Sequence, residues 1–93
     1  MSLEQVDGRD IGKIMLYALS TCVWCKKTKQ LLDSLGVKYS YIYMDLIQGK
    51  EKENKLKDLE KWNPRCSYPT IVINNSKCIV GFREEEIKEA LKI

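Results

Sequence analysis

Two strand-like runs on either side of one helical segment constrain this chain more than any other feature. The first run, KIMLYA (13–18), is apolar and has the length of a buried strand, and the second, VKYSYIYM (37–44), is rich in aromatic and β-branched residues. Between them, apolar residues recur at helical spacing from Cys22 to Gly36, where a helix should end. Strands joined by one helix lie parallel in a sheet, so we expect a β-α-β unit.

A second helix, a hairpin and a last helix follow along the chain. Residues 49–62 predict a surface helix, because their charges alternate in sign and only a narrow apolar stripe interrupts them. The apolar runs 69–73 and 77–80 flank Asn74-Asn75-Ser76, which predicts a β-hairpin because Asn tolerates the left-handed conformation of tight turns. Apolar residues at helical spacing predict a last helix after residue 82.

Length and composition predict one globular domain. The 93 residues are enough for a single hydrophobic core, and 44% hydrophobic with 31% charged residues is an ordinary globular balance. Residues 1–12 lack periodicity, which predicts a loose or strand-like lead-in, flexible in its N-terminal part, before a single domain at residues 13–93. The predicted fold class is α/β, with the order β-α-β-α-β-β-α and a four-stranded mixed sheet flanked by three helices.

Charge and hydropathy exclude several kinds of partner. The 16 Lys and Arg are interleaved with 13 Asp and Glu, which predicts a solvated surface rather than a nucleic-acid interface. No run reaches the roughly 18 apolar residues of a membrane span, and the N-terminus lacks the apolar run of a signal peptide. We therefore expect a monomer in the cytoplasm that binds neither nucleic acid nor membrane.

The candidate catalytic residues are Cys22 and Cys25 in the stretch STCVWCKK. The chain has no histidine, so imidazole cannot activate a nucleophile or act as acid or base. A cysteine at the start of a helix meets unpaired N–H groups and the positive end of the helix dipole, which favour the thiolate. Cys25 follows one turn later and should be the more buried thiol. Cys22 is therefore predicted to attack a disulfide, and Cys25 to resolve the mixed disulfide that forms.

Other roles for the cysteines have less support from the sequence. A structural disulfide at this spacing closes too small a loop to contribute much stability. A four-cysteine metal site would need Cys66 and Cys78, which lie twelve residues apart and do not form a second close pair. Cys78 falls within a predicted strand and is expected to be a small core residue. Cys66 lies in a loop before Pro69 and is a candidate third reactive thiol.

Three motifs resemble the glutaredoxins of the thioredoxin-fold superfamily: TCVWC, SYPTIVIN and IVGFREEEI. The resemblance extends from about residue 13 to the C-terminus, and it implies a cis Pro69 that faces the cysteine pair. It also implies that the backbone of Tyr68 is exposed to pair with an extended substrate. The substrate-binding residues that it implies are Tyr68, Pro69, Gly81, Phe82 and Arg83. Trp24, between the cysteines, is expected on the exposed rim as an apolar contact for a protein substrate.

Two departures from the family pattern bear on the electron donor. Glutathione-using glutaredoxins usually carry a lysine where this chain has Leu19, and a Gly-Gly pair followed by Asp where it has residues 80–84. CVWC and GFRE are instead similar to NrdH redoxins, which implies a disulfide reductase as donor and ribonucleotide reductase among the protein disulfide targets. We expect no tightly bound cofactor, with glutathione or another low-molecular-weight thiol as a candidate co-substrate.

The predicted function is thus a dithiol-disulfide oxidoreductase that carries electrons to protein disulfides. The family leaves two alternatives open, a glutathione-dependent deglutathionylase and an iron-sulfur cluster carrier that holds a cluster through Cys22. A binding module that keeps the fold without the chemistry is a third alternative.

Overall fold

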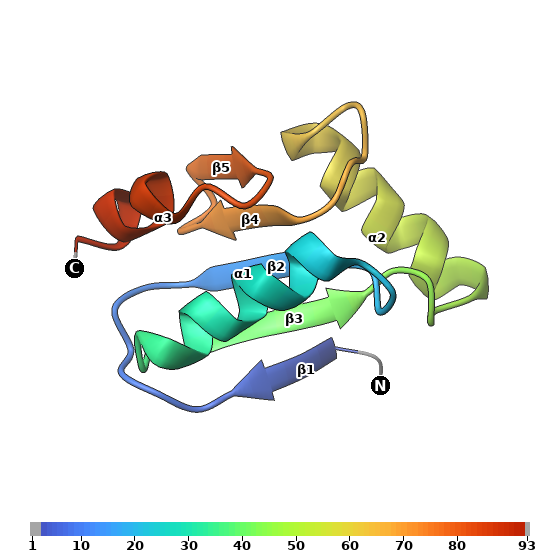
Figure 1. Cartoon of the computed structure of the whole chain (residues 1–93). Coiled ribbons are helices and arrows are strands. Elements are labelled where there is room, and N and C mark those ends of the chain that lie inside the picture. The colour runs from blue at the N-terminus through green and yellow to red at the C-terminus, as the bar shows by residue number, and fades with distance from the viewer. Residues whose placement is uncertain (1–2, 93) are drawn as a thin grey trace.

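The computed structural model describes residues 3–92 and contains a five-stranded sheet with three helices (Figure 1). The elements in chain order are β1 (Leu3–Val6), β2 (Ile14–Ala18), α1 (Val23–Ser34), β3 (Tyr39–Tyr43), α2 (Gly49–Trp62), β4 (Thr70–Ile73), β5 (Lys77–Val80) and α3 (Glu84–Leu91). The strands lie side by side in the order β1-β3-β2-β4-β5. As predicted, β2 and β3 are parallel, and β4 and β5 form an antiparallel hairpin.

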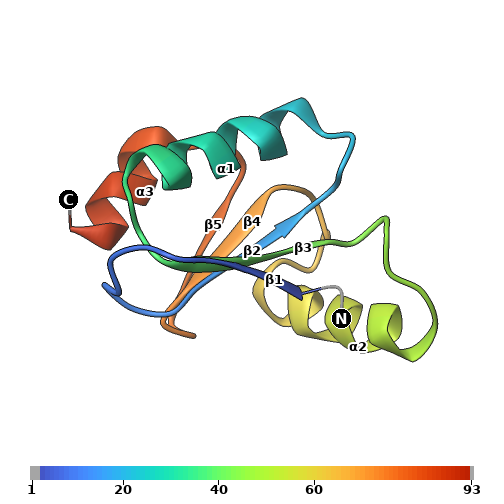
Figure 2. The same cartoon turned by 90° about the horizontal axis from the view of Figure 1, so that it is seen from below.

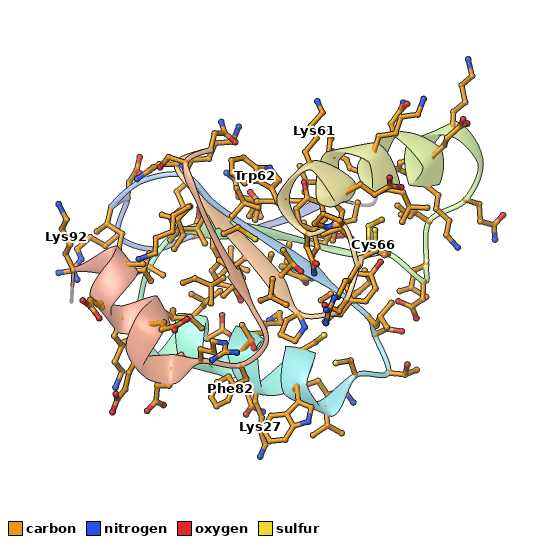
Figure 3. The ribbon with its side chains drawn as sticks, turned by 90° about the horizontal axis from the view of Figure 1, so that it is seen from above. Lys27, Lys61, Trp62, Cys66, Phe82 and Lys92 are labelled. Atoms are coloured by element: carbon orange, nitrogen blue, oxygen red, sulfur yellow. The ribbon has the colours of Figure 1, made fainter. Side chains whose placement is uncertain are left out.

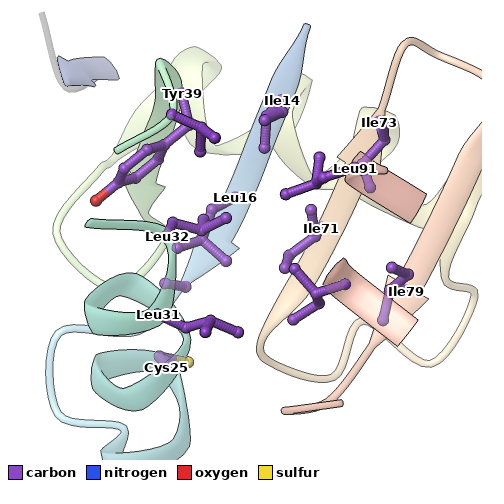
Figure 4. Close-up of a cluster of buried hydrophobic side chains, with 13 residues drawn as sticks. Ile14, Leu16, Cys25, Leu31, Leu32, Tyr39, Ile71, Ile73, Ile79 and Leu91 are labelled. Atoms are coloured by element: carbon purple, nitrogen blue, oxygen red, sulfur yellow. The ribbon is translucent and has the colours of Figure 1, made fainter. Parts of the chain in front are cut away.

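The helices divide between the two faces of the sheet. Figure 2 shows α1 and α3 on one face and α2 on the other. Side chains alternate along each strand, so Leu16 and Ile71 pack under α1 and α3, whereas Tyr17 and Val72 pack under α2. Figure 4 shows the first of these two clusters, in which Leu32 of α1 meets the strand side chains. The sheet therefore separates two hydrophobic cores.

The fifth strand corrects the prediction of a four-stranded sheet. Residues 3–6 form β1, which pairs antiparallel with β3 at one edge of the sheet. The contact continues at Gly8, where a Cβ atom would lie 2.5 Å from the Val37 carbonyl carbon, and the Arg9 N–H donates to the Gly36 carbonyl at 2.8 Å. β1 is mostly exposed, so its stability comes from backbone hydrogen bonds to a distant strand rather than from an apolar pattern of its own. The boundary at residue 13 stays a prediction, and Met1 and Ser2 lie outside the described residues.

The turn of the predicted hairpin is confirmed. Asn74 and Asn75 have φ of 54° and 52°, the left-handed conformation of both central residues in a type I′ turn. The Asn74 side chain also accepts a hydrogen bond from the Lys13 N–H at 2.8 Å. The turn is thereby joined to the start of β2, and this end of the sheet lies opposite the end that carries the cysteine pair.

Candidate active site

Cys22 is the N-cap residue of α1 and follows the carboxyl end of β2, the central strand of the sheet, after the three residues 19–21. Its backbone is extended, with φ −90° and ψ 119°, and its Sγ accepts a hydrogen bond from the Cys25 N–H at 3.2 Å. The first turn of α1 contains no acidic residue, so no carboxylate there repels a negative sulfur. The Cys22 side chain is half-buried. A sulfur atom thus takes the place that a Ser or Asp oxygen usually has at a helix start.

Cys25 lies one turn further along α1 and is only 1% exposed, which confirms that it is the more buried of the pair. Burial, and then the hydrogen bond and charge of the neighbouring Cys22, raise the pKa of the Cys25 thiol to about 12. Both cysteines are free thiols in this structure. The pair therefore consists of an accessible sulfur that accepts an N–H and a buried sulfur that keeps its proton.

Asp45 holds the loop that leads into Cys22, a role that the sequence did not predict. Its carboxylate accepts hydrogen bonds from the Ser20 N–H, at 2.9 Å, and from the Ser20 hydroxyl. These bonds lower the pKa of Asp45. Asp45 follows β3 and Ser20 follows β2, and the carboxyl ends of parallel strands meet at one edge of a sheet. That topology, taken with a polar residue after each strand, is the signal that could have identified the contact.

The Tyr68–Pro69 peptide bond is cis, as the sequence motif implied. Tyr68 is half-buried and packs against both hydrophobic clusters. Burial raises the pKa of its hydroxyl, and the charges of Cys66 and Cys25 contribute in the same direction, so the ring lies near both thiols. The Pro69 carbonyl accepts a hydrogen bond from the Gly81 N–H at 2.8 Å. This bond joins the start of β4 to the turn before α3, so the three motifs meet at one end of the sheet.

Trp24 is 56% exposed, which confirms the prediction that it lies on the rim. Its ring stacks on Phe82, with centroids 6.1 Å apart and planes 27° apart, and the Lys27 ammonium lies 4.7 Å from the Trp24 ring centroid. Figure 3 shows Phe82 and Lys27 close to each other on this side of α1. Val23 adds a second apolar side chain, 63% exposed. We call the surface formed by Val23, Trp24 and Phe82 the aromatic rim.

Arg83 and Gly81 flank the aromatic rim. Arg83 precedes α3, is exposed, donates from Nε to the Val80 carbonyl at 3.1 Å and lies 3.9 Å from the Glu86 carboxylate. Glu86 belongs to the first turn of α3, and both charged side chains of this pair are exposed to solvent. Gly81 has φ 88°, a conformation that favours glycine, which explains a glycine between the hairpin and the last helix.

The remaining cysteines lie in different surroundings. Cys66 is half-buried beside the cluster under α2 (Figure 3), and burial, with a contribution from Glu60, raises the pKa of its thiol. Cys78 lies in the edge strand β5, half-buried rather than fully buried, and burial raises the pKa of its thiol as well. Within residues 3–92, no group of three or more His, Cys, Asp or Glu side chains is placed to hold a metal ion. In the same part of the chain, no helix is both long and apolar enough to cross a membrane.

Comparison with known proteins agrees with this geometry. The chain matches the family model described as glutaredoxin over residues 14–79. It is similar to the solved glutaredoxin of Methanosarcina mazei Go1, with 49% identity, coverage of 100% of this chain and 90% of that chain, and a TM-score of 0.93. It is also similar to Methanosarcina acetivorans methanoredoxin, with 52% identity, coverage of 92% and 90%, and a TM-score of 0.89.

The NrdH-redoxin of Escherichia coli is a more distant neighbour. It is 22% identical, with coverage of 83% of this chain and 92% of that chain and a TM-score of 0.63, which shows a shared fold alone. The family match includes both cysteines of the pair, the cis proline, all of β4, and β5 as far as residue 79. The chain belongs to the glutaredoxin family, thioredoxin-fold proteins whose general chemistry is thiol-disulfide exchange.

Proposed function

We propose that this protein is a dithiol-disulfide oxidoreductase that reduces disulfide bonds in other proteins, with Cys22 as nucleophile and Cys25 as resolving thiol. The observation that carries the proposal is the contrast within the pair. The Cys22 sulfur accepts an N–H at the start of α1, whereas Cys25 is 1% exposed one turn away. A thiolate is the nucleophile in disulfide exchange, and the buried thiol is protected from reacting first.

In the first step, the Cys22 thiolate attacks one sulfur of the substrate disulfide. A Cys22–substrate disulfide forms, the substrate S–S bond breaks, and the other substrate sulfur leaves as a thiolate that takes a proton from water. No protein base is needed, because the Cys25 N–H and the helix start stabilise the attacking thiolate directly.

In the second step, Cys25 loses its proton and attacks the Cys22 sulfur. The Cys22–Cys25 disulfide forms and the second substrate thiolate is released, so the substrate gains two electrons and two protons and the pair becomes oxidised. The hydrogen bond and charge of Cys22 help to raise the pKa of the Cys25 thiol in the reduced protein. Once Cys22 is in a mixed disulfide its negative charge is gone, so deprotonation of Cys25 becomes easier at the step that needs it.

Substrate recognition uses two surfaces next to Cys22. Within residues 3–92, no hydrogen bond occupies the backbone N–H or carbonyl of Tyr68, so an extended substrate segment has a free edge with which to pair. The aromatic rim offers an apolar contact on the other side of the pair. Pro69, Gly81 and Arg83 contribute to recognition indirectly, because they hold the backbone at this end of the sheet in the conformation that presents the two surfaces. A protein disulfide in an extended segment satisfies both surfaces.

The electron donor that restores the dithiol is a disulfide reductase or a low-molecular-weight thiol. Leu19 stands where glutathione-using glutaredoxins usually carry a lysine, so a cationic contact for a glutathione carboxylate is absent at that position. We therefore favour a reductase over glutathione as donor, in the cytoplasm. Ribonucleotide reductase is one protein disulfide target to test, because its reduction can be assayed directly.

The test is capture of the intermediate. Native insulin, with its disulfide bonds intact, is mixed with the reduced Cys25→Ser protein, and the covalent product is mapped by mass spectrometry after acid quenching. We expect a disulfide between Cys22 and insulin that builds up in Cys25→Ser and not in Cys25→Ser with Cys22→Ser. A matched Cys78→Ser protein should turn over like the parent. If Cys22 forms no adduct, or if Cys66 forms it instead, the proposal is wrong.

A further inference from the structure

The α2 face of the sheet contains a cavity that the redox reaction does not use. Its volume is about 410 Å³, within the range of small-molecule pockets. The strand side chains of Met15, Tyr17 and Val72 line it, and all three belong to the cluster under α2. Trp62 lines it from the C-terminal end of α2, where Figure 3 shows its ring beside the helix. The cavity thus has an apolar and aromatic interior, across the sheet from α1.

Positive charge predominates around this cavity. Lys13, Lys55 and Lys61 line it, against a single acid, Asp58. Figure 3 shows Lys61 extending outward from α2, which places it at the rim. Lys55 is half-buried, and across residues 3–92 no ion pair within 4.0 Å joins any of these lysines to a carboxylate. Three ammonium groups against one carboxylate give the mouth of the cavity a positive potential, which favours an incoming anion.

Tyr17 supplies a polar group inside the cavity. The residue is 5% exposed overall and its hydroxyl makes no hydrogen bond to the protein within residues 3–92, and because no buried side-chain N or O atom of these residues lacks a partner, the hydroxyl must reach the solvent that fills the cavity. Burial raises the pKa of Tyr17, and the charge of Asp58 raises it further, so the hydroxyl remains protonated and lies near that carboxylate. An unpartnered hydroxyl that lines a cavity is available to a bound molecule.

We propose that this cavity binds a small organic anion with an apolar body. The body packs on Met15, Val72 and Trp62, as aromatic and aliphatic linings favour. A carboxylate, sulfonate or phosphate monoester lies toward Lys13 and Lys55. A polar atom of the ligand pairs with the Tyr17 hydroxyl. The site is separate from the cysteine pair, because Tyr17 and Val72 face α2 whereas the cluster that contains Cys25 lies on the other face.

Two probes that differ by one charged group test the proposal. 8-Anilino-1-naphthalenesulfonate carries a sulfonate on an aromatic body, and N-phenyl-1-naphthylamine is its uncharged counterpart. Each is titrated into the reduced protein, residues 1–93, with fluorescence for affinity and backbone amide chemical shifts for location. We expect single-site binding, shifts centred on Met15, Tyr17 and Trp62, and an affinity at least about threefold higher for the sulfonate.

Matched variants then separate the cavity from general surface charge. Lys13→Met and Lys55→Met should each weaken sulfonate binding about threefold and leave the uncharged probe unchanged. Tyr17→Phe should weaken binding by a similar factor, because it removes only the hydroxyl. Lys57→Met is the control, since Lys57 is exposed on α2, does not line the cavity and changes the net charge equally.

Two outcomes would overturn the proposal. Shifts centred on Trp24 and Phe82 would mean that the probe binds the aromatic rim. Equal weakening by Lys55→Met and Lys57→Met would mean that only net charge matters. Neither outcome depends on disulfide reduction, so this proposal and the redox proposal fail independently.

Discussion

Four cysteines of identical chemistry occupy two kinds of surroundings in this protein. Cys22 is the N-cap of a helix and its sulfur accepts an N–H at 3.2 Å, with Cys25 beneath it. Cys66 lies in a loop and Cys78 in an edge strand, and the sulfur of neither accepts a hydrogen bond within residues 3–92. Burial raises the pKa of both. The comparison predicts that backbone donors and location, rather than residue type, set the reactivity of each cysteine.

The comparison is tested most strongly by removing one thiol at a time. Cys22→Ser should lower the rate of insulin disulfide reduction by about 10³-fold, because no other sulfur is stabilised as a thiolate at the start of α1. Cys66→Ser and Cys78→Ser should each stay within about twofold of the parent. The measurement is initial rate with a reductase-coupled or dithiothreitol-coupled assay. A large loss in Cys66→Ser would move Cys66 into the reaction.

Alkylation rates sharpen the same comparison without substitution. In the fully reduced protein at neutral pH, iodoacetamide should modify Cys22 about tenfold or more faster than Cys66 and Cys78, since the thiolate is the reacting form. Cys25 should react slowest, because it is 1% exposed. Peptide mass spectrometry at timed quenches measures each rate. Equal rates at Cys22 and Cys78 would show that the N-cap position confers no reactivity.

The pH dependence of stability should distinguish Cys25 from Cys66 and Cys78. Its pKa in the folded protein is raised to about 12, above the roughly 8.5 of a free thiol, so above pH 8.5 the unfolded chain releases a proton that the folded chain keeps. Stability of the reduced protein should therefore fall as pH rises from about 8.5 toward 12, by at most about 1.4 kcal/mol per pH unit from this group. Below about pH 8.5 the group contributes no slope.

Urea unfolding at pH 8, 9 and 10 under reducing conditions measures that slope. Cys25→Ala should flatten it between pH 9 and 10, before most tyrosines titrate. Cys78→Ala is the matched control, with a smaller expected change. An unchanged slope in Cys25→Ala would show that the Cys25 thiol titrates normally in the folded protein.

The smallest effect is expected from a substitution in the aromatic rim, which lies beside the Cys22–Cys25 pair and not beside Cys66 or Cys78. Trp24→Ala should raise KM for insulin about fivefold and leave kcat/KM for a small disulfide such as hydroxyethyl disulfide unchanged, because a small substrate does not reach the rim. The Trp62→Phe protein controls for loss of a tryptophan elsewhere. Equal loss with both substrates would mean that Trp24 supports α1 rather than contacting substrate.

Local patterns along the chain predicted most of the fold. The helix at Gly49–Trp62 has the predicted bounds, and the Asn74-Asn75 turn follows from the left-handed conformation that Asn tolerates. The strand at β3 is shorter than the predicted run 37–44, because Val37 and Lys38 instead contact the segment before β2. Local signals of this kind predict an element correctly when the segment buries one face on which apolar residues recur with the period of a helix or a strand.

The contacts that were missed join segments far apart in sequence. β1 has few apolar residues and is held at the sheet edge by backbone pairing with β3, which its own sequence does not show. Asp45 and Ser20 are polar residues in separate loops, and only the parallel pairing of β2 and β3 brings them together. The Trp24–Phe82 stack likewise joins α1 to the turn before α3.

By itself, the sequence determined the order of the elements from β2 to α3, the family and the position of the cysteine pair at a helix start, because each depends on local spacing and residue type. Only the tertiary structure decided which thiol is buried by how much, which loop Asp45 holds, and that Tyr17 and Lys55 line one cavity. Burial, hydrogen bonding and charge act over a few ångströms in space, and a folded sheet brings residues within that range regardless of their separation along the chain.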